Sequence, residues 1–192
     1  MKDGRKPVFT IGGIPIYGDA ILAPLAGYSD TPFRLLCRRF GSAMSYLPCV
    51  ADNEVIYRSP RKPDPLHFIG EERPVAIQLL SGNAQMLLRA AKKLLERDPD
   101  IIDINRGCPA RRVTSGGRGA ALLRTPKKVA RMTGMLIDEL PVPVTAKIRL
   151  GWDEGSRNYL EIAQRLEDSG ISAIAVHGRT RAQGYSGEAD WQ

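Results

Sequence analysis

Residues 100–124 read DIIDINRGCPARRVTSGGRGAALLR, and this stretch decides the fold class. It opens on a short apolar run, Ile101–Asn105, which predicts a buried strand, and it continues as a long loop rich in glycine and arginine. In parallel α/β folds, the loops that follow the carboxyl ends of strands build the active site. The stretch therefore predicts one strand of a parallel sheet, followed by a functional loop that contains Cys108.

Short apolar runs of the same kind recur on both sides of this stretch, with amphipathic segments between them. We expect strands at Ala20–Pro24, Met44–Leu47, Val75–Leu79, Ile101–Asn105, Val142–Ile148 and Ala173–His177. Residues that can begin or end a helix stand between them at Asp30, Gly41, Asn83, Thr125, Ser156 and Gly170. Ahead of the first strand, alternating residues around a Gly-Gly pair predict a short hairpin over residues 9–17.

Strands that alternate with helices are typical of a parallel sheet covered by helices. A dinucleotide-binding Rossmann sheet would need G-x-G-x-x-G after its first strand, but APLAGYSDTP at 23–32 has one glycine. A (β/α)8 barrel fits the lengths of the units, although such barrels typically need about 250 residues and this chain has 192. We therefore predict an α/β fold that is an incomplete (β/α)8 TIM barrel, with about six of its eight βα units, preceded by the short hairpin.

The net charge of +7 is concentrated in one segment. Eight of the 28 basic residues lie between Ile104 and Ile137, a segment that contains no acidic residue. Such a segment favours a polyanionic partner, and phosphate groups are the usual one. A solvated basic face without a partner is the alternative. With 43% apolar and 26% charged residues, the composition is that of a globular protein and argues against a disordered chain.

The three cysteines and two histidines exclude a disulfide scaffold and argue against a structural zinc site, because no C-x-x-C pair is present. We expect reduced thiols, no bound metal and a cytoplasmic location. Neither a signal peptide nor a membrane-spanning run is predicted. Cys37 shares a helical spacing with Phe33, Leu36 and Phe40, which predicts a place in the core. Packing is also expected for Cys49, with an approach to the barrel mouth as the alternative.

Several longer blocks make the chain similar to a known family, the tRNA-dihydrouridine synthases, which are flavin enzymes of the (β/α)8 class. The resemblance runs from about residue 9 to the last residue and is carried by ILAPLAGYSDTPFR (21–34), RPVAIQL (73–79), DIIDINRGCP (100–109), GGRGAALL (116–123), PVTAKIRLGW (143–152) and AVHGRTRAQGYSGEADW (175–191). It implies FMN-dependent reduction of uridine to 5,6-dihydrouridine in tRNA, with NADPH as the reductant. Three places depart from the pattern of the family: Arg106, Leu47–Cys49 and Arg111–Arg112.

The resemblance also implies roles for single residues. Cys108 matches the proton donor of the family, and a thiol with a pKa near about 8.5 is mostly protonated at neutral pH. The implied cofactor-binding positions are Pro24, Leu25, Ala26, Gln78, Lys147 and His177. Asn105 and Arg149 would meet the uracil ring. From the basic segment, we expect Arg111, Arg112 and Arg118 to contact tRNA.

Members of this family carry two further barrel units and a carboxyl-terminal helical domain that grips tRNA. We therefore expect residues 1–192 to form a single, truncated flavin-binding barrel domain without that helical domain. Such a chain should hold FMN weakly and associate with itself through exposed sheet edges. Two alternatives stay open. One is another flavin barrel that acts on a free pyrimidine, such as a dihydroorotate dehydrogenase, and the basic segment disfavours it. The other is an inactive fragment that retains some RNA binding.

Overall fold

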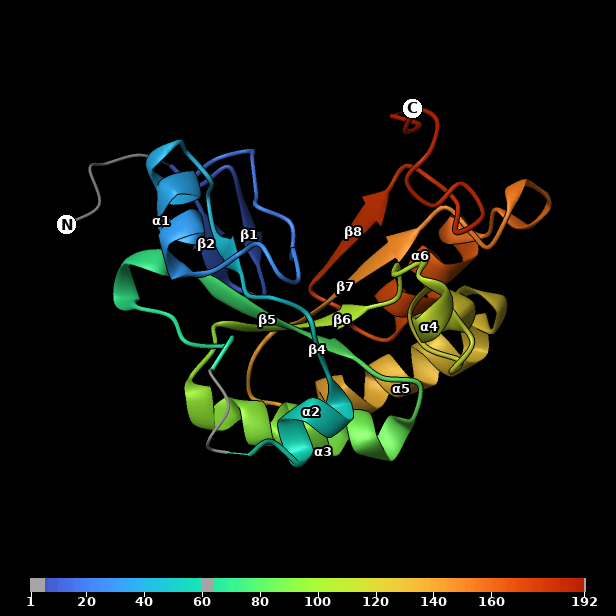
Figure 1. The fold of residues 1–192 in the computed structure, drawn as a ribbon, viewed down its shortest axis with the longest axis horizontal. Helices are drawn as coiled ribbons and strands as arrows, with labels where there is room; N and C mark the ends of the chain where they lie inside the picture. The colour runs from blue at the N-terminus through green and yellow to red at the C-terminus, as the bar shows by residue number, and fades with distance from the viewer. Residues whose placement is uncertain (1–5, 60–63, 192) are drawn as a thin grey trace.

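The computed structural model describes residues 6–59 and 64–191. Figure 1 shows a curled parallel sheet with helices along its outer side and a short hairpin near one end. The hairpin pairs β1 (Phe9–Ile11) with β2 (Ile14–Ile16), as predicted. The strands of the sheet are β3 (Ser45–Tyr46), β4 (Val50–Ala51), β5 (Val75–Leu80), β6 (Ile101–Asn105), β7 (Val144–Arg149) and β8 (Ala173–His177). The helices are α1 (Thr31–Arg39), α2 (Asp52–Ile56), α3 (Ala84–Leu94), α4 (Arg111–Thr114), α5 (Pro126–Glu139) and α6 (Tyr159–Asp168).

The strand order in the sheet follows the order along the chain. The path is β3-β5-β6-β7-β8, all parallel, and β4 pairs with the far end of β5. A doubly wound sheet would reverse direction at a switch point, whereas a barrel adds each new strand on the same side. This curled sheet with its covering helices confirms the prediction of an incomplete (β/α)8 barrel.

Two apolar clusters lie on opposite faces of the sheet. On the outer face, α3, α5 and α6 bury their apolar stripes against the strands, with Leu87, Met132 and Ile162 fully buried. On the inner face, the hairpin residues Ile11 and Ile16 close one end of the half-barrel by packing with other buried side chains of the sheet. The polar side chains at the other end of the strands are therefore left at an open mouth.

The local signals for helix ends are mostly confirmed. The Asp30 side chain accepts a hydrogen bond from the N–H of Phe33 at 3.0 Å, and the Asn83 side chain caps α3 in the same way. Thr125 precedes α5, whose first residue is a proline, as predicted. The start predicted at Ser156 is wrong, because residues 154–156 form a separate 3-10 turn and α6 begins at Tyr159.

The first predicted strand, Ala20–Pro24, is wrong as well. This segment forms no strand and joins no sheet. Its Ala20 carbonyl accepts from the N–H of Ala43 at 2.8 Å, and the Leu22 N–H donates to the Ser42 hydroxyl at 3.0 Å. One of these two bonds uses a side chain, so the segment is held beside the chain that leads into β3 without a backbone ladder.

The core position predicted for Cys37 is only partly met, and its apolar neighbours are exposed. Phe33 is 37% exposed, Leu36 49% and Phe40 85%, while Cys37 is half-buried. At about 100° per residue, these three apolar side chains point away from Arg34, which is the buried residue of α1. Arg34 points inward, where it pairs with the buried Glu72, and the apolar side chains lie on the exposed side of the helix.

Candidate active site

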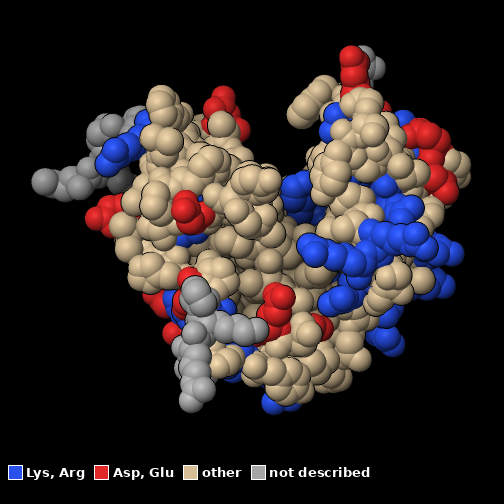
Figure 2. All heavy atoms as spheres, viewed as in Figure 1, with Lys and Arg blue, Asp and Glu red and all other residues tan. Residues whose placement is uncertain are grey.

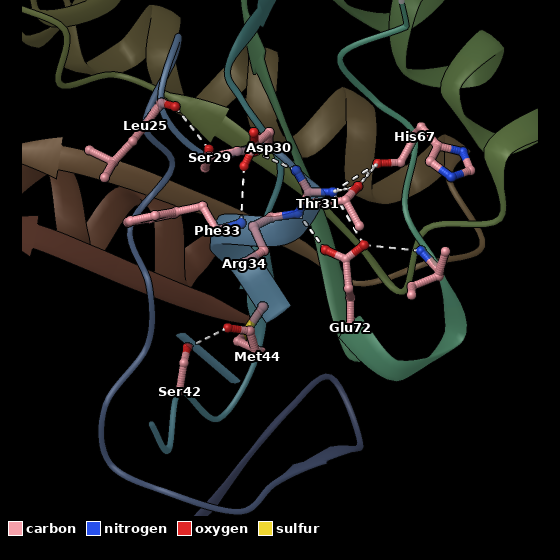
Figure 3. Close-up of polar contacts among 11 residues, drawn as sticks. Leu25, Ser29, Asp30, Thr31, Phe33, Arg34, Ser42, Met44, His67 and Glu72 are labelled. Atoms are coloured by element: carbon pink, nitrogen blue, oxygen red, sulfur yellow. Dashed lines mark hydrogen bonds and ion pairs between the residues drawn. The ribbon is translucent and has the colours of Figure 1, made fainter. Parts of the chain in front are cut away.

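The segment that carries Pro24, Leu25 and Ala26 is fixed by a buried ion pair. Figure 3 shows Arg34 pointing from α1 toward Glu72, and both side chains are almost completely buried. The same guanidinium donates to the Ser29 carbonyl, and the Ser29 hydroxyl in turn donates to the Leu25 carbonyl at 2.8 Å. A turn at Leu25–Ser29 is thereby tied to the segment that leads into β5.

A chain of buried polar side chains crosses β5, β6 and β7. Asp103 accepts from Gln78 Nε2 at 2.7 Å and from Thr145 Oγ1 at 2.6 Å. Asn105 Nδ2 donates to Gln78 Oε1 at 2.8 Å. Burial raises the pKa of Asp103 to about 6, although hydrogen bonds from Thr145 and Gln78 and the charge of Lys147 oppose that rise. The register explains the grouping, because it sets these residues side by side on the inner face of the sheet.

The loop after β6 holds Cys108 next to this chain of side chains. Asn105 Oδ1 accepts from the backbone N–H groups of Gly107 and Cys108, at 3.1 and 2.9 Å. The Cys108 side chain is half-buried, and its carbonyl accepts from the N–H of Ala120 at 3.1 Å. Gly119 has φ +57°, and a Cβ there would lie 2.8 Å from the Cys108 carbonyl oxygen, so only glycine fits this approach. The loop is thus folded back on itself around the cysteine.

Cys49 also lies at this mouth. Its sulfur is 3.5 Å from Asn105 Nδ2, and burial raises the pKa of its thiol to about 12. Cys49 is therefore largely packed, as predicted, and also lies near the barrel mouth, which is the alternative interpretation. At neutral pH this thiol stays protonated, because its pKa is far above that pH.

A pocket of about 750 Å³ lies between the segment at Ile21–Pro24 and the ends of β7 and β8. Figure 2 shows the surface hollowed between the amino-terminal part of the chain and its carboxyl-terminal part. Among the residues lining the pocket are three of the predicted cofactor positions, Pro24, Lys147 and His177. A fourth predicted position, Gln78, is fully buried, and its side chain is hydrogen-bonded to Asp103.

The charged residues that line this pocket are Lys147, Arg179 and Glu188, so cations outnumber anions there. Burial first, and then the positive charges of Arg149, Lys147 and Arg179, lower the pKa of His177 to about 4, so this imidazole is neutral at pH 7. Among the described residues, His177 Nδ1 is buried without a hydrogen-bond partner. Burial lowers the pKa of Lys147, and the carboxylate of Asp103 opposes that shift. A neutral imidazole beside several cations suits a ligand with acceptor atoms or negative charge.

Arg149 ties the loops after β6 and β8 together. It is 3% exposed and donates through Nε to the Gly107 carbonyl at 2.8 Å. Its Nη1 donates to the carbonyls of Thr180 and Gly184, at 2.9 and 2.8 Å. The guanidinium carbon also lies 5.8 Å from the centre of the exposed Tyr185 ring. The predicted contact of Arg149 with uracil stays a prediction, and its contacts in the structure are with these loops.

Seven of the eight basic residues in the acid-free segment are exposed or half-buried. We refer to them together as the basic surface: Arg111, Arg112, Arg118, Arg124, Lys127, Lys128 and Arg131. Figure 2 shows Lys and Arg side chains gathered on one side of the hollow. Within the part of the chain that the structure describes, none of these side chains forms an ion pair. Arg106 belongs to the same segment but is fully buried, where it donates to the Ser81 carbonyl at 2.8 Å.

Sequence reasoning missed several contributors to the site. Arg34, Glu72, Asp103 and Thr145 were not singled out, and only the alternation of polar residues in DIIDIN and VTAKIR could have indicated the last two. Over residues 6–59 and 64–191, no helix is long and apolar enough to cross a membrane. In those same ranges, His, Cys, Asp and Glu side chains form no group of three that could hold a metal ion.

Comparisons with known proteins agree with this geometry. The sequence profile of a family described as dihydrouridine synthase matches residues 21–192. The tRNA-dihydrouridine synthase B of Pseudomonas aeruginosa is 42% identical over 96% of this chain and 56% of its own length. A probable tRNA-dihydrouridine synthase 1 of Synechocystis is 39% identical over 97% of this chain and 52% of its own length. The chain therefore spans about half the length of the curated relatives that it matches.

Proposed function

Because the chain belongs to the dihydrouridine synthase family, we propose that it reduces uridine in tRNA to 5,6-dihydrouridine, with FMN as cofactor and NADPH as reductant. The observation that carries the proposal is the juxtaposition at the mouth of the half-barrel. Cys108 lies there on a loop whose backbone is held by Asn105, close to the polar chain that approaches Lys147. The pocket lined by Lys147 and His177 opens at the same end of the sheet.

The residues of the pocket fit a flavin. Its volume is within the range of about 300–1,000 Å³ that small-molecule sites occupy. Ile21, Ala23 and Ala175 supply apolar walls for a planar ring, and the buried Nδ1 of His177 supplies a polar atom that is not engaged by the described protein residues. Lys147 would place its positive charge where the ring system gains negative charge. When bound and reduced by NADPH, FMN would supply the hydride that C6 of the uracil ring receives.

Cys108 would supply the proton for C5 of the same ring. A positioned cysteine thiol can act as a general acid. Its backbone N–H is fixed by Asn105 at 2.9 Å, and the Gly107 carbonyl before it is fixed by Arg149 at 2.8 Å. The protein's part in the chemistry is therefore to hold one proton donor in place beside the pocket.

The basic surface supports RNA as the carrier of the uracil. Its cations form no ion pairs among the described residues and lie in the loop and helices that follow β6, the strand that leads to Cys108. A uridine within tRNA must leave its stack to reach the pocket, at a cost of a few kcal/mol, and phosphate contacts can offset that cost. A small free pyrimidine would make no use of such a surface, so a free uridine should be a poor substrate.

The test is the conversion of unmodified tRNA, read by mass spectrometry as a gain of two hydrogens at uridine. The 192-residue chain is assayed with FMN and NADPH, beside a hybrid that carries the remaining segment of the Pseudomonas aeruginosa relative. Cys108→Ala should abolish uridine reduction in the active form while leaving oxidation of NADPH in place. Cys37→Ala, on α1, is the matched control and should keep full turnover. Full turnover by Cys108→Ala would overturn the proton-donor role.

A further inference from the structure

We propose that Asp103 is a positioning residue. It determines which group donates and which accepts in a series of hydrogen bonds that runs through two side-chain amides to the backbone of the Cys108 loop. The proposal deepens the proposed function, since it takes Cys108 as the reacting group of that function. Asp103 precedes Asn105 by two residues on β6 and is 1% exposed, so it acts only through other residues.

The chain runs through two side-chain amides. Gln78 Nε2 donates to Asp103 Oδ2 at 2.7 Å, and Gln78 Oε1 accepts from Asn105 Nδ2 at 2.8 Å. Asn105 Oδ1 then accepts from the backbone N–H groups of Gly107 and Cys108. Every link is within ordinary hydrogen-bond distance. A single unbroken series of bonds therefore connects the carboxylate to the backbone of the reacting cysteine.

The two ends of this series fix the orientation of both amides. An ionised carboxylate only accepts, so the Gln78 side chain must turn its NH2 group toward Asp103. A backbone N–H only donates, so the Asn105 side chain must turn its oxygen toward Gly107 and Cys108. With both ends set, the bond between Gln78 and Asn105 has one possible direction. Each amide is held in one of its two flipped states.

This arrangement gives a reason for a buried carboxylate that forms no ion pair among the described residues. Burying such a group is unfavourable unless hydrogen bonds satisfy it. Thr145 satisfies the other oxygen at 2.6 Å, which leaves Oδ2 to Gln78 alone. A side-chain amide of the same shape at position 103 would retain one acceptor, so its NH2 group would face either Gln78 or the Thr145 hydroxyl. Facing Gln78, it would oppose the Gln78 NH2 group, which cannot turn while Asn105 is held by the backbone N–H groups.

The experiment exploits this mismatch with two complementary substitutions. Gln78→Glu sets an acceptor against the Asp103 carboxylate, and Asp103→Asn removes the acceptor pair that holds the Gln78 NH2 group in one orientation. Each single variant should loosen the Cys108 loop. The double variant Asp103→Asn with Gln78→Glu restores a donor–acceptor match at both links, because the carboxylate at position 78 accepts from the amide at position 103 on one side and from Asn105 on the other. Thr145→Val, which removes only the bond to Oδ1, is the matched control within the network.

Two readouts follow the loop without tRNA or cofactor. One is the hydrogen-exchange rate of the Gly107 and Cys108 amides, and the other is the rate at which iodoacetamide alkylates Cys108, measured by peptide mapping. Each single variant should raise both rates by about tenfold or more, as expected for the loss of a hydrogen bond to a charged group. In the double variant, both rates should be within about threefold of those of the parent. In Thr145→Val, both rates should also stay within about threefold of the parent.

Mutual rescue separates positioning from general structural damage. Rates unchanged in both single variants would overturn the proposal, and so would a double variant as fast as the faster single. Circular dichroism shows whether Asp103→Asn is folded, and if it is not, Gln78→Glu and its rescue by Asp103→Asn decide the matter alone. A failure of tRNA reduction with the expected exchange pattern would refute the proposed function and still support the role of Asp103.

Discussion

Replacing Arg34 with methionine should destabilise the fold by about 4 kcal/mol, because removal of one partner leaves a buried charge unpaired. Arg34 is 1% exposed and Glu72 is 0% exposed. The guanidinium contacts both Glu72 oxygens and also donates to the carbonyl of His67 at 2.8 Å. Without it, Glu72 keeps the N–H of Ile69 at 3.0 Å as a donor. Breaking a buried pair in this way costs about 3–5 kcal/mol, a large share of the roughly 5–15 kcal/mol that typically stabilise a domain.

Urea unfolding followed by circular dichroism measures this loss. The matched control is Arg165→Met, which removes the same group from an ion pair with Glu161 on the surface of α6. Those two side chains are 37% and 51% exposed, so the control should lose at most about 0.5 kcal/mol. The double change of Arg34→Met with Glu72→Leu should recover most of the loss, since no buried charge then remains. A loss below about 1 kcal/mol for Arg34→Met would refute the role given to this pair.

Three further predictions concern charge, pH and the sheet edge. Neutralising Arg111, Arg112 and Arg118 together should weaken tRNA binding and flatten its dependence on salt by about one unit of slope for each lost phosphate contact, and an unchanged slope would place the RNA elsewhere. The pKa of His177 is about 4 in the folded chain, against an ordinary value of 6.5, so the unfolded chain takes up a proton first as the pH falls. The fold therefore loses stability between pH 6.5 and pH 4. In urea titrations, His177→Asn should lose less stability than the parent between about pH 7 and pH 4.5. Val176 is 45% exposed on the edge strand β8 and should promote self-association. Val176→Lys should therefore lower the sedimentation coefficient at high protein concentration. A parent and a variant that are both monomeric would contradict this prediction.

Features that depend on neighbouring residues could be predicted from the sequence. A helix cap needs only one side chain that accepts from the N–H three residues later. The caps predicted at Asp30 and at Asn83 both form this bond. The β6 strand matches its prediction from end to end, because three buried isoleucines within five residues indicate a strand without knowledge of its partners. The loop after it could be singled out for the same reason, since its charge and glycine content are local properties.

Features that depend on residues far away in the sequence could not be predicted from it. The burial of Arg34 follows from Glu72, 38 positions away, and that pairing turned the apolar face of α1 outward against its pattern. The segment at Ala20–Pro24 has a strand-like sequence, but a side-chain hydroxyl supplied by Ser42 takes the place of a ladder bond. The roles of Asp103 and Thr145 depend on the register between β6 and β7, which no local pattern specifies.

The central claim is that the pocket beside Lys147 and His177 holds a flavin within reach of the Cys108 loop. Titration of FMN into the 192-residue chain, followed by the absorption and fluorescence of the flavin, tests it most directly. We predict saturable binding of one flavin per chain, weakened about tenfold by Lys147→Ala, the loss expected for a contact with a charged group. Lys92→Ala, which removes an exposed lysine paired with Glu139, should leave the affinity unchanged. Absence of saturable binding, or equal affinity in Lys147→Ala and the parent, would contradict the account.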